Sequence, residues 1–283
     1  MTTQLIDGHA LAQTWLAEVA RMAQTAPHKP RVALVMMGDN PASRAYIRRK
    51  IASAASVGIE ADEIALRADE GEAALHSVLH GLAHDPHTHG VIVQAPLPPH
   101  IDTHAAFDAV PWFKDVDGLS RASRQRRLAG EPCHLPATPA AIVRLLTEHL
   151  HMNLRGLPIA VVGKGLTVGT PLREMLDAAG AEVIGIDRDT PHPQTLCRRA
   201  DVVVAACGVA GLITQDWCKE GACVLDVGIS RSTDHGHTAL HGDVNVASVD
   251  GHIGMRSPVP GGIGPLTVAS LLANVVRAQQ LAP

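Results

Sequence analysis

The feature that most constrains the fold is a short apolar run that recurs along the chain and alternates with helical stretches. Residues 31–38 read RVALVMMG, and residues 158–163 read PIAVVG. Runs this apolar are typical of strands buried on both faces of a parallel sheet. Their alternation with helices indicates parallel sheets with crossover helices. Similar runs lie at 90–98, 181–187, 200–207 and 222–228.

The alternation of strand and helix restarts near residues 140–157, so we predict two α/β domains with parallel sheets. The first is placed at 1–142 together with a C-terminal helix in 265–283, which is expected to pack back on it. The second is placed at 143–264. A chain of 283 residues is long for one domain and sufficient for two. The loop at 230–243 is expected to be a polar excursion.

Composition argues against several kinds of partner. The formal net charge is −4 and aromatic residues make up 2% of the chain, so we expect no nucleic-acid partner. No apolar stretch approaches the roughly 18 residues of a membrane span, and we expect no membrane partner. The N-terminus lacks the pattern of a signal peptide, and the five cysteines lack CxxC spacing. A reducing, cytoplasmic location is the simplest interpretation.

A glycine-rich turn lies near the start of the second predicted domain. The stretch VVGKGLTVGTP (161–171) follows a strand and precedes a helix, and it contains Gly163, Gly165 and Gly169. Glycines at such a turn let backbone N–H groups approach a pyrophosphate at the helix N-terminus. This predicts a Rossmann-type nucleotide-binding domain. The spacing is looser than the usual dinucleotide fingerprint, so a plain strand–helix turn is the alternative.

Charged residues near this turn bear on the choice of nucleotide. Asp187 ends the next strand, 24 residues after Gly163 in the sequence. An acid at about this separation typically binds the ribose of NAD. Arg188 and Lys164 are cations that would suit the 2′-phosphate of NADP. Asp187 could equally be a solvated strand end, and Arg188 a surface charge. We favour NADP, with NAD as the alternative.

The stretch PASRAYIRRK (41–50) contains the single tyrosine of the chain, Tyr46, four residues before Lys50. Residues i and i+4 of a helix lie on one face, so these two side chains are expected to project together. A similar pair occurs in short-chain dehydrogenases, but there the glycine turn precedes the pair, and here Gly163 follows it. A half-buried tyrosine beside a surface lysine is the plainer interpretation.

Three further segments follow PASRAYIRRK in order: GVIVQAPLPPHID (90–102), PWFKDVDGL (111–119) and SPVPGGIGPLTVASLL (257–272). Together the four segments resemble the bifunctional methylenetetrahydrofolate dehydrogenase/cyclohydrolase family, and the resemblance covers nearly the whole chain. It implies oxidation of 5,10-methylenetetrahydrofolate with NAD(P)+ and hydrolysis of the methenyl product to 10-formyltetrahydrofolate. It also implies a cytoplasmic homodimer with the active site in the cleft between its two domains.

The resemblance assigns roles to four residues of the first domain. Lys50 matches a lysine that would shuttle protons during hydrolysis, which requires a pKa lowered towards neutrality. Gln94 matches a glutamine that would hydrogen-bond this lysine without adding charge. Tyr46 matches a tyrosine that stacks on the aminobenzoyl part of folate. Asp117 matches a carboxylate that would bind the pterin, and an acid of an Asp-Gly turn is the plainer alternative.

The resemblance also assigns the nucleotide side. Gly163, Lys164 and Gly165 align with a Gly-Arg-Ser turn of the family. Arg188 falls where a phosphate-binding serine commonly lies. Ile229 matches a backbone contact on the nicotinamide side.

The resemblance also covers the loop 260–262, whereas the sequence at 119–132 differs from that of the family. Pro260, Gly261 and Gly262 match a loop that closes over the substrate, where glycine permits close approach of the backbone. At 119–132 the chain reads LSRASRQRRLAGEP, and Ser123 replaces the family's usual asparagine. This stretch also holds a basic cluster, either a solvated face or an attraction for the glutamate tail of folate, formed by Arg121, Arg124, Arg126 and Arg127.

Two alternative functions remain. One is a specialised or monofunctional folate-binding paralogue that retains one of the two activities. The other is a dehydrogenase of an unrelated small substrate, against which Asp117 counts. A metal site is not expected, because the chemistry requires none and the histidine clusters fall in polar loops; these clusters are His84, His87 and His89, and His235, His237 and His241.

Overall fold

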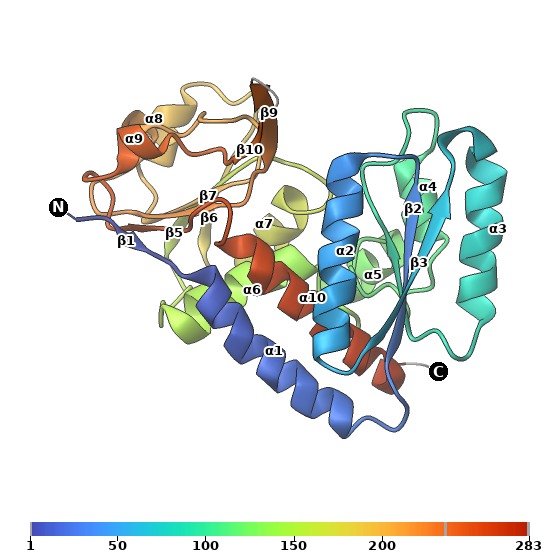
Figure 1. The fold of residues 1–283 in the computed structure, drawn as a ribbon. Helices are drawn as coiled ribbons and strands as arrows, with labels where there is room; N and C mark the ends of the chain where they lie inside the picture. Colours follow the sequence, from blue (N-terminus) through green and yellow to red (C-terminus); the bar gives the residue numbers. More distant parts are fainter. Residues whose placement is uncertain (1, 235–236, 282–283) are drawn as a thin grey trace. The chain divides into compact units, whose positions relative to one another are not determined.

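The computed structural model describes residues 2–234 and 237–281, with side chains described except at 231–239. The chain divides into two compact units. The six-stranded unit comprises the N-terminal residues to Ala12 and Thr138–Thr267, and the three-stranded unit comprises Gln13–Ala137 and the residues from Val268 onwards. Each unit contains a parallel sheet with helices, which confirms the predicted fold class (Figure 1). The assignment of a substrate domain and a nucleotide domain with a boundary at 142/143 stays a prediction.

The three-stranded unit has a sheet between helices (Figure 1). Its strands are β2 (Arg31–Met37), β3 (Glu60–Leu66) and β4 (Gly90–Val93), in the order β3-β2-β4. Its helices are α2 (Pro41–Ser56), α3 (Gly71–His84), α4 (Thr103–Asp108) and α5 (Arg121–Leu128), with most of α1 (Gly8–Gln24) and α10 (Ile263–Leu281). Val32, Leu34 and Met36 of the central β2 join a buried cluster with α1, α2 and α10. Helix α10 therefore packs in the same buried cluster as β2.

The six-stranded unit has a parallel sheet in the order β1-β11-β8-β7-β5-β6. Its strands are β1 (Gln4–Leu5), β5 (Pro158–Val162), β6 (Glu182–Ile186), β7 (Val202–Ala205), β8 (Cys223–Asp226) and β11 (Met255–Arg256). Its helices include α6 (Ala137–Arg144), α7 (Gly169–Ala178), α8 (Pro193–Cys197) and α9 (Val246–Val249). Because β6 and β7 flank β5 on opposite sides, the strand order reverses at β5. Open α/β sheets bind ligands outside the carboxyl ends of the strands at such a point.

One segment of the six-stranded unit differs from the sequence prediction. The loop expected at 230–243 contains an antiparallel hairpin of β9 (Ser230–Asp234) and β10 (His237–His241). The end of this hairpin is held by the Asp226 carboxylate, which accepts hydrogen bonds from the backbone N–H groups of Asp243 (2.9 Å) and Val244 (3.1 Å). The sequence of this stretch is mostly polar and lacks the apolar alternation that predicts a strand.

Candidate active site and its family

Helix α2 carries the tyrosine and the lysine, and its start is well defined. The Asn40 side chain caps the helix by accepting hydrogen bonds from the N–H groups of Ala42 (2.8 Å) and Ser43 (3.3 Å). Pro41 occupies the first turn, where its missing N–H costs nothing. Fixing the helix start also fixes the directions of Tyr46 and Lys50, which follow Pro41 by five and nine residues.

Lys50 is buried at the centre of the candidate site. Its side chain is 5% exposed, and its Nζ donates a hydrogen bond to Oε1 of Gln94 at 3.2 Å. Gln94 directly follows β4 and uses its own Nε2 to donate to the Ala95 carbonyl at 2.6 Å, which fixes the orientation of the amide. Burial lowers the pKa of Lys50, and the Asp117 carboxylate partly opposes this shift. The expected lysine–glutamine pair is thus present, inside one unit.

Tyr46 and Asp117 lie around the lysine. The Lys50 Nζ is 4.9 Å from the centre of the Tyr46 ring, so these residues do share one helix face. Burial, with a contribution from Asp117, raises the pKa of Tyr46 to about 12, which keeps its hydroxyl protonated at neutral pH. Burial also raises the pKa of Asp117, while Lys50 lowers it and Asp115 raises it further. Burial is the largest of these effects, so the pKa of Asp117 lies above its ordinary value.

The glycine turn of the six-stranded unit begins where β5 ends. Gly163 has φ +118°, and a Cβ at this position would lie 2.2 Å from the Ala206 carbonyl oxygen just beyond β7. A Cβ at Gly169 would lie 2.3 Å from the Gly163 carbonyl oxygen, so the start of α7 packs directly on the turn. Gly165 has open space around its missing Cβ. Two of the glycines are thus required by close backbone packing at the strand-order reversal.

The charges near this turn are arranged differently from the expectation of two cations beside the ribose. Lys164 is paired with Asp187 (Nζ to Oδ2 3.2 Å) and lies 3.5 Å from the Asp189 carboxylate. Arg188 is exposed and has no ion pair within the described part of the chain. Ile229 is 55% exposed, just after β8. Of the two cations, Arg188 is the one whose charge is available to a ligand.

Sequence reasoning missed a half-buried arginine, Arg173, beside the same turn. The Arg173 side chain extends from α7, and its Nη2 donates to the carbonyls of Val161 (2.9 Å), Gly163 (2.8 Å) and Ile186 (2.7 Å). It therefore ties the carboxyl ends of β5 and β6 together. A Cβ at Gly185 would lie 2.7 Å from this guanidinium, so the glycine inside β6 makes room for it. That glycine, unusual in a strand interior, is the sequence signal for the arginine.

The loop Pro260–Gly262 precedes α10 in the six-stranded unit. Gly261 has φ +103°, and a Cβ at Gly262 would lie 2.6 Å from the Pro258 carbonyl oxygen. Both glycines are thus required by the path of the backbone. In the described residues no three His, Cys, Asp or Glu side chains group as metal ligands would. Of the histidine clusters, His235 and the side chain of His237 lie outside the described residues.

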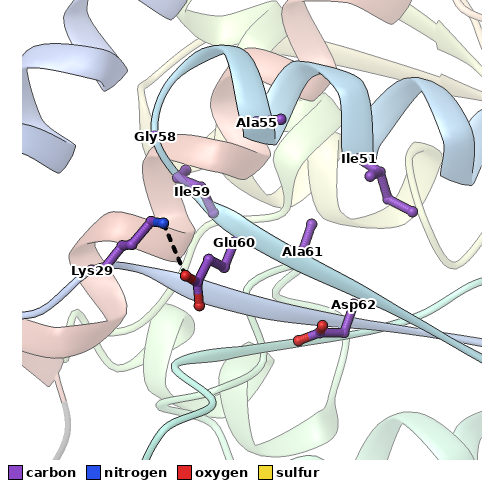
Figure 2. Close-up of a pocket in the computed structure, with 8 residues that line it drawn as sticks. All are labelled: Lys29, Ile51, Ala55, Gly58, Ile59, Glu60, Ala61 and Asp62. Carbon is purple, nitrogen blue, oxygen red and sulfur yellow. Dashed lines mark ion pairs between the residues drawn. The ribbon is translucent and has the colours of Figure 1, made fainter.

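A shallow groove elsewhere in the three-stranded unit is separate from these residues. It has a volume of about 370 Å³ and runs between the end of α2, at Ile51 and Ala55, and the start of β3 (Figure 2). Lys29 and Glu60 form an ion pair of 2.9 Å beside it. None of the predicted site residues lines this groove. It lies beside β3, which is an edge strand of the sheet.

Comparison with known proteins decides the family. Residues 6–117 match the catalytic domain and residues 136–282 match the NAD(P)-binding domain of tetrahydrofolate dehydrogenase/cyclohydrolase. The chain belongs to the tetrahydrofolate dehydrogenase/cyclohydrolase family. Bifunctional protein FolD 3 of Ectopseudomonas mendocina is 41% identical over 286 residues, which cover 99% of this chain and 93% of that protein.

Solved structures of the family agree with this assignment. The bifunctional FolD enzyme of Campylobacter jejuni, a methylenetetrahydrofolate dehydrogenase/cyclohydrolase, is 32% identical with a TM-score of 0.92, covering 99% of both chains. The Trypanosoma brucei enzyme, solved with an NADP cofactor and an inhibitor, is 29% identical with a TM-score of 0.93, covering 99% of this chain and 98% of that one.

Family membership confirms the predicted pair of activities. The chain is an enzyme that oxidises 5,10-methylenetetrahydrofolate with a nicotinamide cofactor and hydrolyses the methenyl product to 10-formyltetrahydrofolate. The monofunctional alternative finds no support in these matches. No helix in the described part of the chain has both the length and the apolarity needed to cross a membrane.

Proposed function

We propose that Lys50 is the proton-transfer group of the cyclohydrolase reaction, with Gln94 as its hydrogen-bond partner. The supporting observation is an amine that is 5% exposed and held at 3.2 Å by an uncharged amide. Burial lowers the pKa of Lys50, so its neutral form is reached closer to physiological pH than that of a solvated lysine. The neutral amine accepts a proton from the attacking water. The resulting ammonium returns a proton to the departing ring nitrogen.

The folate is proposed to lie against Tyr46 and Asp117. A pterin edge presents an N–H and an amino group, and the carboxylate of Asp117 can accept from both. Burial raises the pKa of Asp117, and the two pterin donors would stabilise the ionised carboxylate that this contact requires. The Tyr46 ring provides a flat surface for the aminobenzoyl group, and its pKa of about 12 excludes it as a base at neutral pH.

The nucleotide is proposed to be NADP+, which accepts the hydride when bound. Its pyrophosphate would lie against Gly163, Lys164, Gly165 and the start of α7 at Gly169, because Gly163 and Gly169 let the backbone pack closely there. Arg188 would form an ion pair with the 2′-phosphate, since it is exposed and has no ion pair among the described residues. The NADP complex of the T. brucei relative supports this preference.

Other groups on the nucleotide side keep their expected roles as part of this proposal. Asp187 would contact the ribose in competition with its present partners: Lys164 pairs with its Oδ2, and its Oδ1 accepts from the Asp189 N–H and the Thr190 hydroxyl. The backbone at Ile229 would contact the nicotinamide. The loop Pro260–Gly262 would close over the substrate.

The protein is further proposed to be a cytoplasmic homodimer. The edge strand β3 pairs with β2 on one side in the described structure, which leaves one row of its backbone groups available to a second copy. The groove of Figure 2 follows this edge. Sedimentation analysis tests the assembly, and a monomer at micromolar concentration would contradict it.

A direct assay tests the function. Purified protein is mixed with 5,10-methylenetetrahydrofolate and either NADP+ or NAD+, and the absorbances of the reduced nicotinamide and of the methenyl product are followed separately. We expect reduced nicotinamide to accumulate while the methenyl signal is consumed, with NADP+ the better cofactor. Methenyl product that disappears no faster than without enzyme would contradict the role given to Lys50.

A further inference from the structure

Two residues before the candidate pterin ligand lies a second buried acid to which no role is assigned above. Asp115 is 5% exposed. Its carboxylate accepts hydrogen bonds from the N–H of Ser120 (2.8 Å), the hydroxyl of Ser123 (2.7 Å) and the N–H of Leu119 (3.3 Å). An ionised carboxylate can only accept, and these donors satisfy it in place of water. Asp115 thereby closes the loop 115–120 on itself, with Asp117 at its centre.

The hydroxyl that faces Asp115 comes from the stretch 119–132, which lies between the two segments that match the family models. Ser123 is fully buried in the first turn of α5, which Ser120 caps by accepting from the Ser123 N–H at 3.1 Å. The Ser120 hydroxyl donates a hydrogen bond to that of Ser123 at 3.0 Å, and the Ser123 hydroxyl in turn donates one to the Asp115 carboxylate. The hydrogen bonds therefore run in one direction, from the cap of α5 to Asp115.

The remainder of the loop is also held, except for Asp117 itself. Lys114 Nζ donates to the carbonyls of Leu82 (2.9 Å) and Asp85 (2.6 Å) at the end of α3. The carbonyl of Val116 accepts a hydrogen bond of 2.9 Å from the Asn274 amide. No hydrogen bond to the Asp117 carboxylate occurs within the described residues. The loop thus holds Asp117 at a fixed place while its carboxylate has no hydrogen-bond partner among the described residues.

We propose that Ser123, acting through Asp115, is a positioning residue for the pterin-binding carboxylate of Asp117. The inference rests on the proposed role of Asp117. Without the Ser123 hydroxyl, the buried Asp115 carboxylate loses a hydrogen-bond donor and moves towards another donor. Because Asp117 is only two residues away along the backbone, this movement also displaces the Asp117 carboxylate. Displacements of about 1 Å in a binding constellation cost on the order of 100-fold. Because Asp117 would contact the pterin in ground and transition states alike, the effect falls on KM rather than kcat.

The test compares four variants in the dehydrogenase assay, with 5,10-methylenetetrahydrofolate varied at saturating nucleotide. Ser123→Ala is expected to raise the KM for folate roughly 10- to 100-fold with kcat within about three-fold and the KM for nucleotide unchanged. Ser123→Thr keeps the hydroxyl but adds a methyl group to a fully buried position. It is expected to lower the melting temperature through overpacking while the folate KM stays near the wild-type value.

The matched control is Asp108→Ala. Asp108 holds the same end of α5 by accepting from the backbone and side chain of Arg121, without contacting Asp115. This variant is expected to destabilise the protein and leave the folate KM unchanged. An equal rise in KM for Asp108→Ala and Ser123→Ala would overturn the proposal, since it would show that the effect comes from α5 stability alone. An unchanged KM in Ser123→Ala would overturn it as well.

Asp117→Asn separates the two levels of the argument. If it raises the folate KM and Ser123→Ala does not, the positioning role is wrong and the proposed role of Asp117 stands. If Asp117→Asn leaves the KM unchanged, the pterin contact fails, and the positioning role fails with it. Should Ser123→Ala not fold, Ser123→Cys fills the site with a much weaker donor and is expected to raise the KM in the same direction.

Discussion

Replacing Lys50 with methionine separates the chemistry of the site from its stability. The change removes the hydrogen bond to Gln94 (3.2 Å) and the cation contact with the Tyr46 ring (4.9 Å). These are worth about 1.5–3 and 0.5–2 kcal/mol respectively. Against this, methionine relieves the cost of holding an amine at 5% exposure, which amounts to several kcal/mol for a buried ion. The free energy of unfolding should therefore change by no more than about 2 kcal/mol.

The rate of hydrolysis should fall far more in Lys50→Met than the stability does. Positioned acid–base groups contribute about 10²- to 10⁴-fold to rate, so Lys50→Met should slow hydrolysis of methenyltetrahydrofolate by that factor. Hydride transfer needs no proton from Lys50 and should fall less. Loss of the methenyl absorbance, corrected for the reaction without enzyme, measures the first effect. Urea unfolding followed by circular dichroism measures the stability.

Lys114→Met is the matched control, since Lys114 is also a buried lysine, at 7% exposure. Its Nζ bonds two backbone carbonyls at the end of α3, so its loss leaves both without a partner and should destabilise the fold. Hydrolysis per folded molecule at saturating substrate should be retained. Hydrolysis by Lys50→Met within about ten-fold of the wild type would refute the catalytic role. A stability loss well above 4 kcal/mol would refute the burial argument.

Three further predictions concern charge. Gln94→Glu places a carboxylate against Lys50, which raises the pKa of the amine, so the pH profile of hydrolysis should shift to higher pH; an unshifted profile would argue against the pair. Arg188→Ala should raise the Kd for NADP+ more than that for NAD+ in fluorescence titration, and equal losses would remove the 2′-phosphate contact. Burial raises the pKa of Asp226 from 3.8 to about 6, so the native state binds the proton more tightly and stability should fall as pH rises between these values. In Asp226→Asn, unfolding curves across this range should lose that pH dependence, and retention of it would assign the effect to another group.

The sequence predicted those parts of the fold that are buried, because buried strands and helices have recognisable apolar patterns. The strands at 31–38 and 158–163 were found because both faces of each are covered. The strand β3, EADEIAL, was missed because it lies at a sheet edge with much of its surface exposed, so its composition is polar. The hairpin at 230–241 was also missed, because its composition is polar.

In the candidate site, local features could be predicted from the sequence, whereas contacts between residues far apart in the sequence could not. The helical spacing of Tyr46 and Lys50 is local, and it predicted a shared face that the structure confirms. The bond between Lys50 and Gln94 joins residues far apart in sequence, and the family resemblance rather than any pattern predicted it. The pairing of Lys164 with Asp187 could not be read from spacing, because charges on successive strand ends meet only once the register is set.

The lowered pKa of Lys50 is the claim on which the catalytic account depends, and NMR can measure it directly. Protein labelled with ¹³C at the lysine side chains would be titrated, and the Lys50 Cε resonance would be assigned by its absence in Lys50→Met. The account predicts a midpoint below the ordinary lysine value of 10.5, because burial disfavours the ammonium. A midpoint at or above 10.5 would contradict it.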